Sequence, residues 1–150
     1  MQFALGAGRR IQEEYVKTGK VKFTFKHFPV VDQGDIGESN WAAQAAECAS
    51  QQAKFWEYHN KLFGVWQGEN VGTYTKSKLK QYAADLGLNV STFNQCLDRD
   101  ETASAVAADV DEAMRLGVEG TPSFFVNGRQ LRVRSLDFTQ FSQALDALLQ

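Results

Sequence analysis

The chain has 150 residues with a formal net charge of −2, and 43% of them are hydrophobic. This composition is typical of one globular domain, expected to cover residues 1–150, and it excludes a strongly basic nucleic-acid surface or a polybasic membrane patch. No apolar run approaches the length of a membrane span, and residues 1–10 lack the apolar stretch of a signal peptide.

The first part of the chain predicts a helix followed by a strand. The helix is expected over about residues 3–17 and ends at Thr18-Gly19, a typical helix C-terminus. Gly6 and Gly8 each weaken it by about 1 kcal/mol. Residues 21–25 alternate between apolar and polar, so we expect a strand with one buried face.

Five amphipathic helices are predicted in the middle of the chain, because apolar residues recur there at helical spacing. Ser91 is the expected N-cap of the fourth helix, and Gly117 is expected to end the fifth. The helices are marked in turn by Trp41, Ala45, Cys48 and Ala49; Phe55, Tyr58 and Leu62; Leu79, Tyr82, Ala83 and Leu86; Phe93, Cys96 and Leu97; and Ala103, Val106, Ala107, Val110 and Met114.

The last part of the chain predicts a β-hairpin and a final helix. Thr121-Pro122 is followed at once by the β-prone residues 123–126 and by Asn127-Gly128, the strongest short hairpin signal. Proline cannot donate a hydrogen bond to a sheet, so it belongs at the first residue of a strand or on an edge. A second strand is expected through Leu131 and Val133. The final helix is marked by Phe138, Phe141, Leu145 and Leu148.

This order of elements is that of the end of a thioredoxin fold with a helical insertion. Four segments, in order and at family-like spacing, carry a more specific resemblance: residues 11–23 with 28–29; 45–49 with 55–59 and 62–63; 86–88 with 93 and 96–97; and 117–128. From first residue to last, the chain resembles the DsbA-like thiol-disulfide oxidoreductases of the bacterial envelope.

The resemblance implies an α/β, thioredoxin-like fold with a helical insertion over about residues 37–116. It implies the formation, reduction or isomerisation of protein disulfides, with no cofactor and no metal. The substrate-binding residues would be Val118, Gly120, Thr121 and Pro122. The Thr121–Pro122 bond would be cis, and the Thr121 backbone would pair with an extended substrate.

The sequence departs from the family at the residues that perform the chemistry. The family's Cys-x-x-Cys stands at the start of the first helix, where the helix dipole stabilises a thiolate. By the family spacing, this motif and the central strand before it would lie just upstream of Met1. We therefore expect no catalytic residue in this chain, and no reduction of insulin or oxidation of a peptide by it. A late-assigned start codon, a trimmed chain and a shortened gene all remain open.

The two cysteines, Cys48 and Cys96, allow three interpretations: a structural disulfide, two buried free thiols, or a redox-active pair. In related DsbA-like proteins, cysteines at matching places join the helices of the insertion. The resemblance therefore implies a Cys48–Cys96 disulfide, which would place the protein outside the cytoplasm.

The remaining polar residues favour structural roles. His27 and His59 are expected to be packing or surface histidines, because no base or ligand partner repeats near them. Glu13-Glu14 and the pair Asp109 and Asp111 are interpreted as solvated helix faces. Ser123 lacks the sequence context of a hydrolase nucleophile.

The expected partners are extended or unfolded thiol-containing polypeptides and a redox partner protein, with no nucleic acid and no membrane span. The expected location is extracytoplasmic, in the periplasm or cell envelope. The alternative function is a redox-inert thioredoxin-fold module that binds peptides or a protein. A missing central strand further predicts one of two arrangements: strands 21–25 and 123–126 pair directly, or another copy inserts a segment and forms a homo-oligomer.

Overall fold

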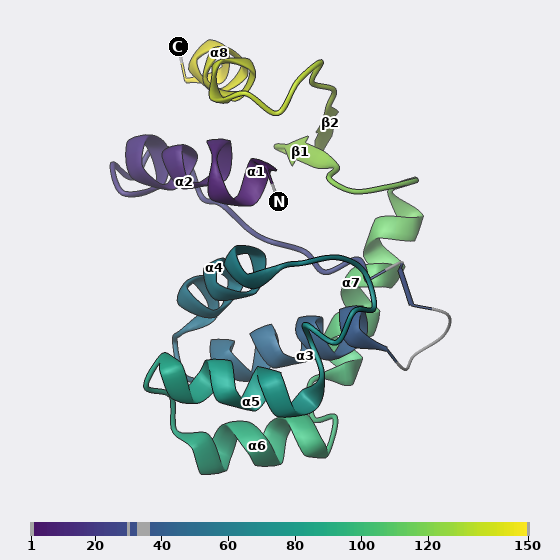
Figure 1. Ribbon diagram of the computed structural model, residues 1–150. Helices are drawn as coiled ribbons and strands as arrows, with labels where there is room; N and C mark the ends of the chain where they lie inside the picture. The colour runs from purple at the N-terminus through teal and green to yellow at the C-terminus, as the bar shows by residue number, and fades with distance from the viewer. Residues whose placement is uncertain (1, 30, 33–36, 150) are drawn as a thin grey trace. The chain divides into compact units, whose positions relative to one another are not determined.

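The computed structural model describes residues 2–29, 31–32 and 37–149 (Figure 1). The described residues form helices and one two-stranded sheet. The chain divides into two compact units. Unit 1 comprises residues 1–25 and 118–150 and contains the sheet, whereas unit 2 comprises residues 26–117 and contains only helices and loops among its described residues.

Unit 1 begins with a helix that is interrupted, where the sequence predicted a continuous one. α1 (Gln2–Leu5) stops before Gly6, α2 (Ala7–Ile11) follows, and the π-helical turn η1 (Gln12–Val16) continues from it. The backbone of Gly6 leaves the helical region at φ −108° and ψ −102°. A Cβ at this position would lie 2.7 Å from the carbonyl oxygen of Gln2. The break therefore needs glycine at this position.

The end of this helical segment is as predicted. Gly19 has a φ of 75°, in the left-handed region that glycine adopts without a steric penalty. The N–H of Lys20 donates to the carbonyl oxygen of Tyr15 at 2.9 Å, which satisfies a carbonyl that the helix leaves unpaired.

The predicted hairpin is present. β1 (Phe124–Val126) and β2 (Arg129–Leu131) pair antiparallel, with Phe124 opposite Leu131 and Val126 opposite Arg129. Asn127 and Gly128 join the strands with φ values of 49° and 77°, the two positive values of a type I′ turn. β2 ends at Leu131, so Val133 lies beyond the strand in which the sequence placed it.

The predicted strand over residues 21–25 is wrong for the part of the chain that the structure describes. These residues belong to no strand, and β1 with β2 makes the sheet found there. The alternating pattern reports burial instead: Val21 packs against the unit 1 core, and the ring of Phe23 lies 6.3 Å from that of Phe3. A strand also needs a neighbour to pair with. Residues 21–25 do not pair with residues 123–126, so the first of the two predicted arrangements is wrong. The second arrangement, a homo-oligomer in which another copy inserts a segment, stays a prediction.

The core of unit 1 forms between the first helices, the hairpin and α8 (Phe138–Leu148). The ring of Phe3 lies 4.5 Å from that of Phe124 and 5.0 Å from that of Phe141. The hydroxyl of Tyr15 donates to Asp146 Oδ1 at 2.7 Å, and this hydrogen bond together with burial raises the pKa of Tyr15 to about 12. Aromatic packing thus anchors β1, the strand that directly follows Thr121-Pro122.

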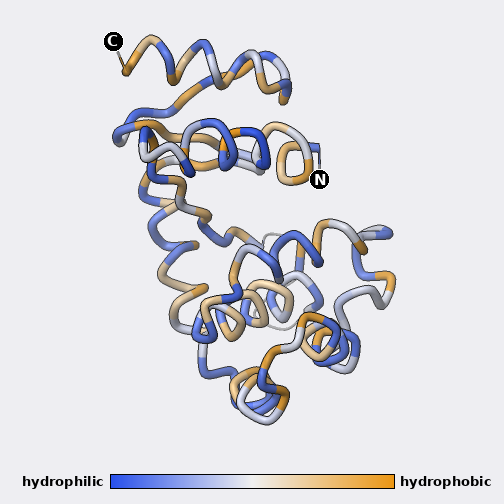
Figure 2. Tube along the Cα trace, turned by 90° about the vertical axis from the view of Figure 1, so that its left-hand side faces the viewer, coloured by the Kyte–Doolittle hydropathy of each residue, from blue (hydrophilic) through white to orange (hydrophobic). Residues whose placement is uncertain are grey.

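Unit 2 consists of the five predicted helices: α3 (Glu38–Ser50), α4 (Phe55–Val65), α5 (Lys76–Asp85), α6 (Val90–Asp98) and α7 (Ala103–Arg115). Apolar and polar residues alternate along the helical turns, as expected of amphipathic helices (Figure 2). The N-cap of α6 is Asn89 rather than Ser91, because Asn89 Oδ1 accepts from the Thr92 N–H at 3.0 Å. The largest fully buried side chains of unit 2 include Tyr58, Phe93, Leu79 and Leu97.

Candidate functional site

The four residues predicted to bind substrate lie on one short loop, residues 118–122, which leads into β1. Gly120, Thr121 and Pro122 are exposed, and Val118 is half-buried. The Thr121–Pro122 bond is cis, as the resemblance implied. The hydroxyl of Ser123 donates to the carbonyl oxygen of Gly120 at 2.7 Å, a hydrogen bond that links the start of the next segment to the loop.

The backbone of Thr121 is available to an incoming chain. Within residues 2–29, 31–32 and 37–149, no hydrogen bond joins its N–H or its carbonyl oxygen to another residue. The neighbouring Gly120 also leaves room, because a Cβ built there would meet no atom within 4 Å. A polypeptide could therefore approach this loop closely and exchange backbone hydrogen bonds with it.

The two cysteines form a disulfide in unit 2. The Cα atoms of Cys48 in α3 and Cys96 in α6 lie 5.9 Å apart, and the bond closes a sequence separation of 48 residues. The exposed fractions of the two residues are 1% and 2%. Of the three interpretations of this pair, the disulfide is the one present, and its burial denies a thiolate the access that exchange requires.

Both histidines are buried, and each has a polar neighbour. His59 lies among Phe55, Trp56 and Phe63, with ring separations between 4.7 and 5.9 Å. Burial lowers the pKa of His59 to about 4. His27 Nε2 lies 2.9 Å from Glu47 Oε1, a pairing that sequence reasoning missed because 20 residues separate the two.

Asp109 is not part of a solvated helix face, so that interpretation is wrong for this residue. Its carboxylate accepts from Lys26 Nζ at 2.8 Å and from the His27 N–H at 2.9 Å. Lys26 also pairs with Glu112 at 2.9 Å, and the hydrogen bonds to Asp109 and Glu112 raise the pKa of the Lys26 ammonium. Asp109 thus holds residues 26–27 against α7. Asp111 is exposed, as predicted.

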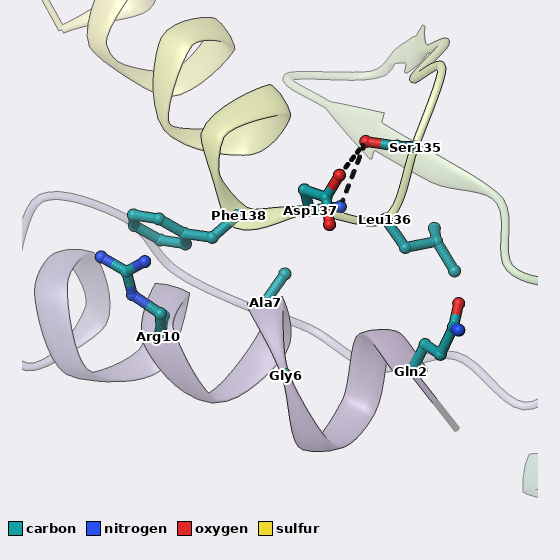
Figure 3. Close-up of a pocket in the computed structure, with 8 residues that line it drawn as sticks. All are labelled: Gln2, Gly6, Ala7, Arg10, Ser135, Leu136, Asp137 and Phe138. Carbon is teal, nitrogen blue, oxygen red and sulfur yellow. Dashed lines mark hydrogen bonds between the residues drawn. The ribbon is translucent and has the colours of Figure 1, made fainter.

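A hollow of about 670 Å³ lies in unit 1 (Figure 3). None of residues 118–122 lines it. Ser135 Oγ donates to Asp137 Oδ2 at 2.7 Å. The Arg10 guanidinium lies 3.8 Å from the centre of the Phe138 ring and donates to Glu14, which is outside the lining. The hollow is lined by Gln2, Gly6, Ala7, Arg10, Ser135, Leu136, Asp137 and Phe138. This lining contains no cysteine and no histidine.

Residues 2–29, 31–32 and 37–149 contain no group of three or more His, Cys, Asp or Glu side chains that could hold a metal ion. None of their helices combines the length and the apolar character that crossing a bilayer requires.

A family model described as thioredoxin matches residues 1–147. The chain is 34% identical over 120 residues to Na(+)/H(+) antiporter NhaA 3 of Salinispora tropica, covering 80% of this chain and 17% of the antiporter. It is 29% identical over 140 residues to the probable disulfide bond formation protein D of Bacillus anthracis, covering 91% of this chain and 62% of that protein. The chain thus spans less than two thirds of either relative.

Among solved structures, oxidised BdbD from Bacillus subtilis superposes with a TM-score of 0.84 at 24% sequence identity. The match covers 99% of this chain and 79% of the BdbD chain. This likeness shows the fold: it is thioredoxin-like, rich in helices and with a small sheet, as the sequence predicted.

Proposed function

Because this chain belongs to the thioredoxin family whose model matches residues 1–147, we propose that it is the polypeptide-binding part of a DsbA-like protein thiol-disulfide oxidoreductase. The observation that carries the proposal is the exposed loop 118–122, in which the Thr121 backbone has no hydrogen-bond partner among the residues that the structure describes. The names of relatives, such as disulfide bond formation protein D, support the same activity.

The loop would hold an extended segment that contains the cysteine of the substrate. In the exchange itself, a thiolate attacks one sulfur of a disulfide, a new S–S bond forms and the other sulfur leaves as a thiolate. The sequence contains no Cys-x-x-Cys, and its two cysteines are joined to each other in the core of unit 2. The attacking thiolate must therefore come from outside residues 1–150, while this chain positions the substrate.

The proposed partners are extended or unfolded thiol-containing polypeptides and a redox partner protein. The proposed location is extracytoplasmic, in the periplasm or cell envelope. The buried Cys48–Cys96 disulfide supports this location, because disulfides form and persist in oxidising compartments.

A redox-inert binding module is the second candidate, and the burial of both cysteines favours it. Under either function, these 150 residues should not reduce insulin above the background rate. Turnover that disappears in the Cys48→Ala variant would overturn the assignment of the disulfide as structural. It would also overturn the expectation that these residues include no catalytic residue. An in-frame Cys-x-x-Cys just before Met1 in the genomic sequence would favour the oxidoreductase over the module.

Peptide binding tests the role of the loop. The probe is a reduced, fluorescein-labelled, extended peptide with one cysteine, followed by fluorescence anisotropy. Gly120→Val should weaken its binding at least about tenfold, because the new side chain would occupy the space through which the peptide approaches Thr121. The substitution should not disturb the fold, since a Cβ at Gly120 meets no atom within 4 Å.

Gly64→Val is the matched control, because a Cβ at Gly64 in α4 also meets nothing within 4 Å. It should leave peptide binding unchanged. Equal weakening by both variants, or a wild-type chain that binds no peptide, would contradict the proposed role of residues 118–122.

A further inference from the structure

Arg132 and Arg134 follow β2 and are both exposed. The intervening Val133, like Leu131 before it, packs against the core of unit 1, so the alternation leaves the arginines on the outer side of the chain. Neither arginine has an ion pair or a hydrogen bond to another residue in the described ranges. Two unpaired cations thus lie on one short segment.

The register of the hairpin brings this segment beside the candidate site. Phe124, the first residue of β1, pairs with Leu131, the last residue of β2. Ser123, just before β1, and Arg132, just after β2, therefore lie at the same end of the sheet. Paired strands lie about 5 Å apart, and Pro122 directly precedes Ser123. Arg132 therefore begins next to the end of β1 to which the loop 118–122 is attached.

Arg129 lies at the other end of β2, opposite Val126 and next to the turn. Arg132 lies three positions further along the chain, which at the rise of a strand is about 10 Å. Arg129 is also exposed and also has no ion pair among the residues described. It is thus the same kind of residue, in the same hairpin, but distant from the loop.

The loop itself contributes one opposing charge. Glu119 is the only charged residue in the sequence between Arg115 and Arg129, and it is exposed. No ion pair joins it to Arg132 or Arg134 within the described residues. The two cations outnumber this anion of the loop, and Asp137, three residues after Arg134, accepts a hydrogen bond from Ser135 Oγ instead. A guanidinium can bind a carboxylate through two parallel hydrogen bonds.

We infer that Arg132 and Arg134 form a cationic rim beside the loop 118–122, and that this rim selects acidic polypeptide segments. The inference rests on the proposed function and extends it by naming the chemistry of the bound segment. Because the attraction between exposed charges fades over about 8–10 Å at physiological salt, it acts on Asp and Glu within a few residues of the segment held at Thr121.

Three labelled peptides test the inference. They share a central segment with one cysteine and differ only in their flanking residues, which are Glu, Gln or Lys. At low salt, the wild-type chain should bind the Glu peptide about five- to tenfold more tightly than the Lys peptide, and high salt should reduce this ratio. The double variant Arg132→Gln/Arg134→Gln should abolish the preference, whereas Arg129→Gln should retain it.

Two results would overturn the cationic rim alone: all three peptides bind equally, or Arg129→Gln loses the preference as fully as the double variant. In both cases, binding that is still sensitive to Gly120→Val would leave the proposed function standing. If no peptide binds, or if Gly120→Val has no effect on any of them, the proposed function fails and the inference fails with it.

Discussion

Replacing both Cys48 and Cys96 with alanine is expected to lower the free energy of unfolding by about 4 kcal/mol. The disulfide closes a loop with a sequence separation of 48 residues, and loop-closure entropy predicts a loss of this size when the constraint on the unfolded chain is removed. The bond joins α3 to α6, both of which contribute to the core of unit 2. Urea unfolding of the wild type and the variant, followed by circular dichroism, measures the difference.

Cys48→Ala alone provides a control, because it removes the same constraint and should show nearly the same loss. Reductant added to the folded wild type provides a second one. Since the cysteines are only 1% and 2% exposed, the disulfide should remain closed until urea unfolds unit 2. A loss below about 1 kcal/mol, or rapid reduction of the folded protein, would show that the disulfide is not a buried structural constraint.

Acidification is expected to cost about 3 kcal/mol of stability through His59. The pKa of this imidazole is lowered from its ordinary 6.5 to about 4, chiefly by burial, with a smaller contribution from the nearby His27 and against the opposing hydrogen bond to Asn60. Between pH 6.5 and pH 4 the unfolded chain therefore binds a proton that the folded chain does not. Stability is fully present above pH 6.5 and falls by about 1.4 kcal/mol per pH unit toward pH 4.

His59→Gln isolates this effect, because glutamine does not titrate and His27 is the only other histidine in the sequence. The carboxylates titrate in both proteins, so the quantity of interest is the difference between their free energies of unfolding at each pH. That difference should change by about 3 kcal/mol between pH 7 and pH 4. Parallel pH curves for the two proteins would contradict a depressed pKa at His59.

The helices of unit 2 and the hairpin could be predicted from the sequence because the signals are local. An amphipathic helix repeats its apolar positions every three or four residues, as Phe93, Cys96 and Leu97 do in α6. Asn127-Gly128 specifies the type I′ turn because both residues tolerate positive φ. The loop 118–122 could be identified in advance for the same reason, since its residues are consecutive and similar to those of the DsbA-like family.

The tertiary structure alone decided what depends on partners distant in the sequence. The alternation of residues 21–25 indicates one buried face, but it does not indicate whether another strand lies alongside. Among the described residues, no strand is found at 21–25. The sequence around Asp109 predicts a solvated side chain. The donors that bind it, in residues 26–27, lie more than 80 positions earlier in the chain.

The position of Arg132 beside the loop belongs to the local part, because the two-residue turn Asn127-Gly128 fixes the register of the hairpin. Local patterns record which side of an element is buried. The contacts that define a site form between elements, and their geometry exists only in the folded chain.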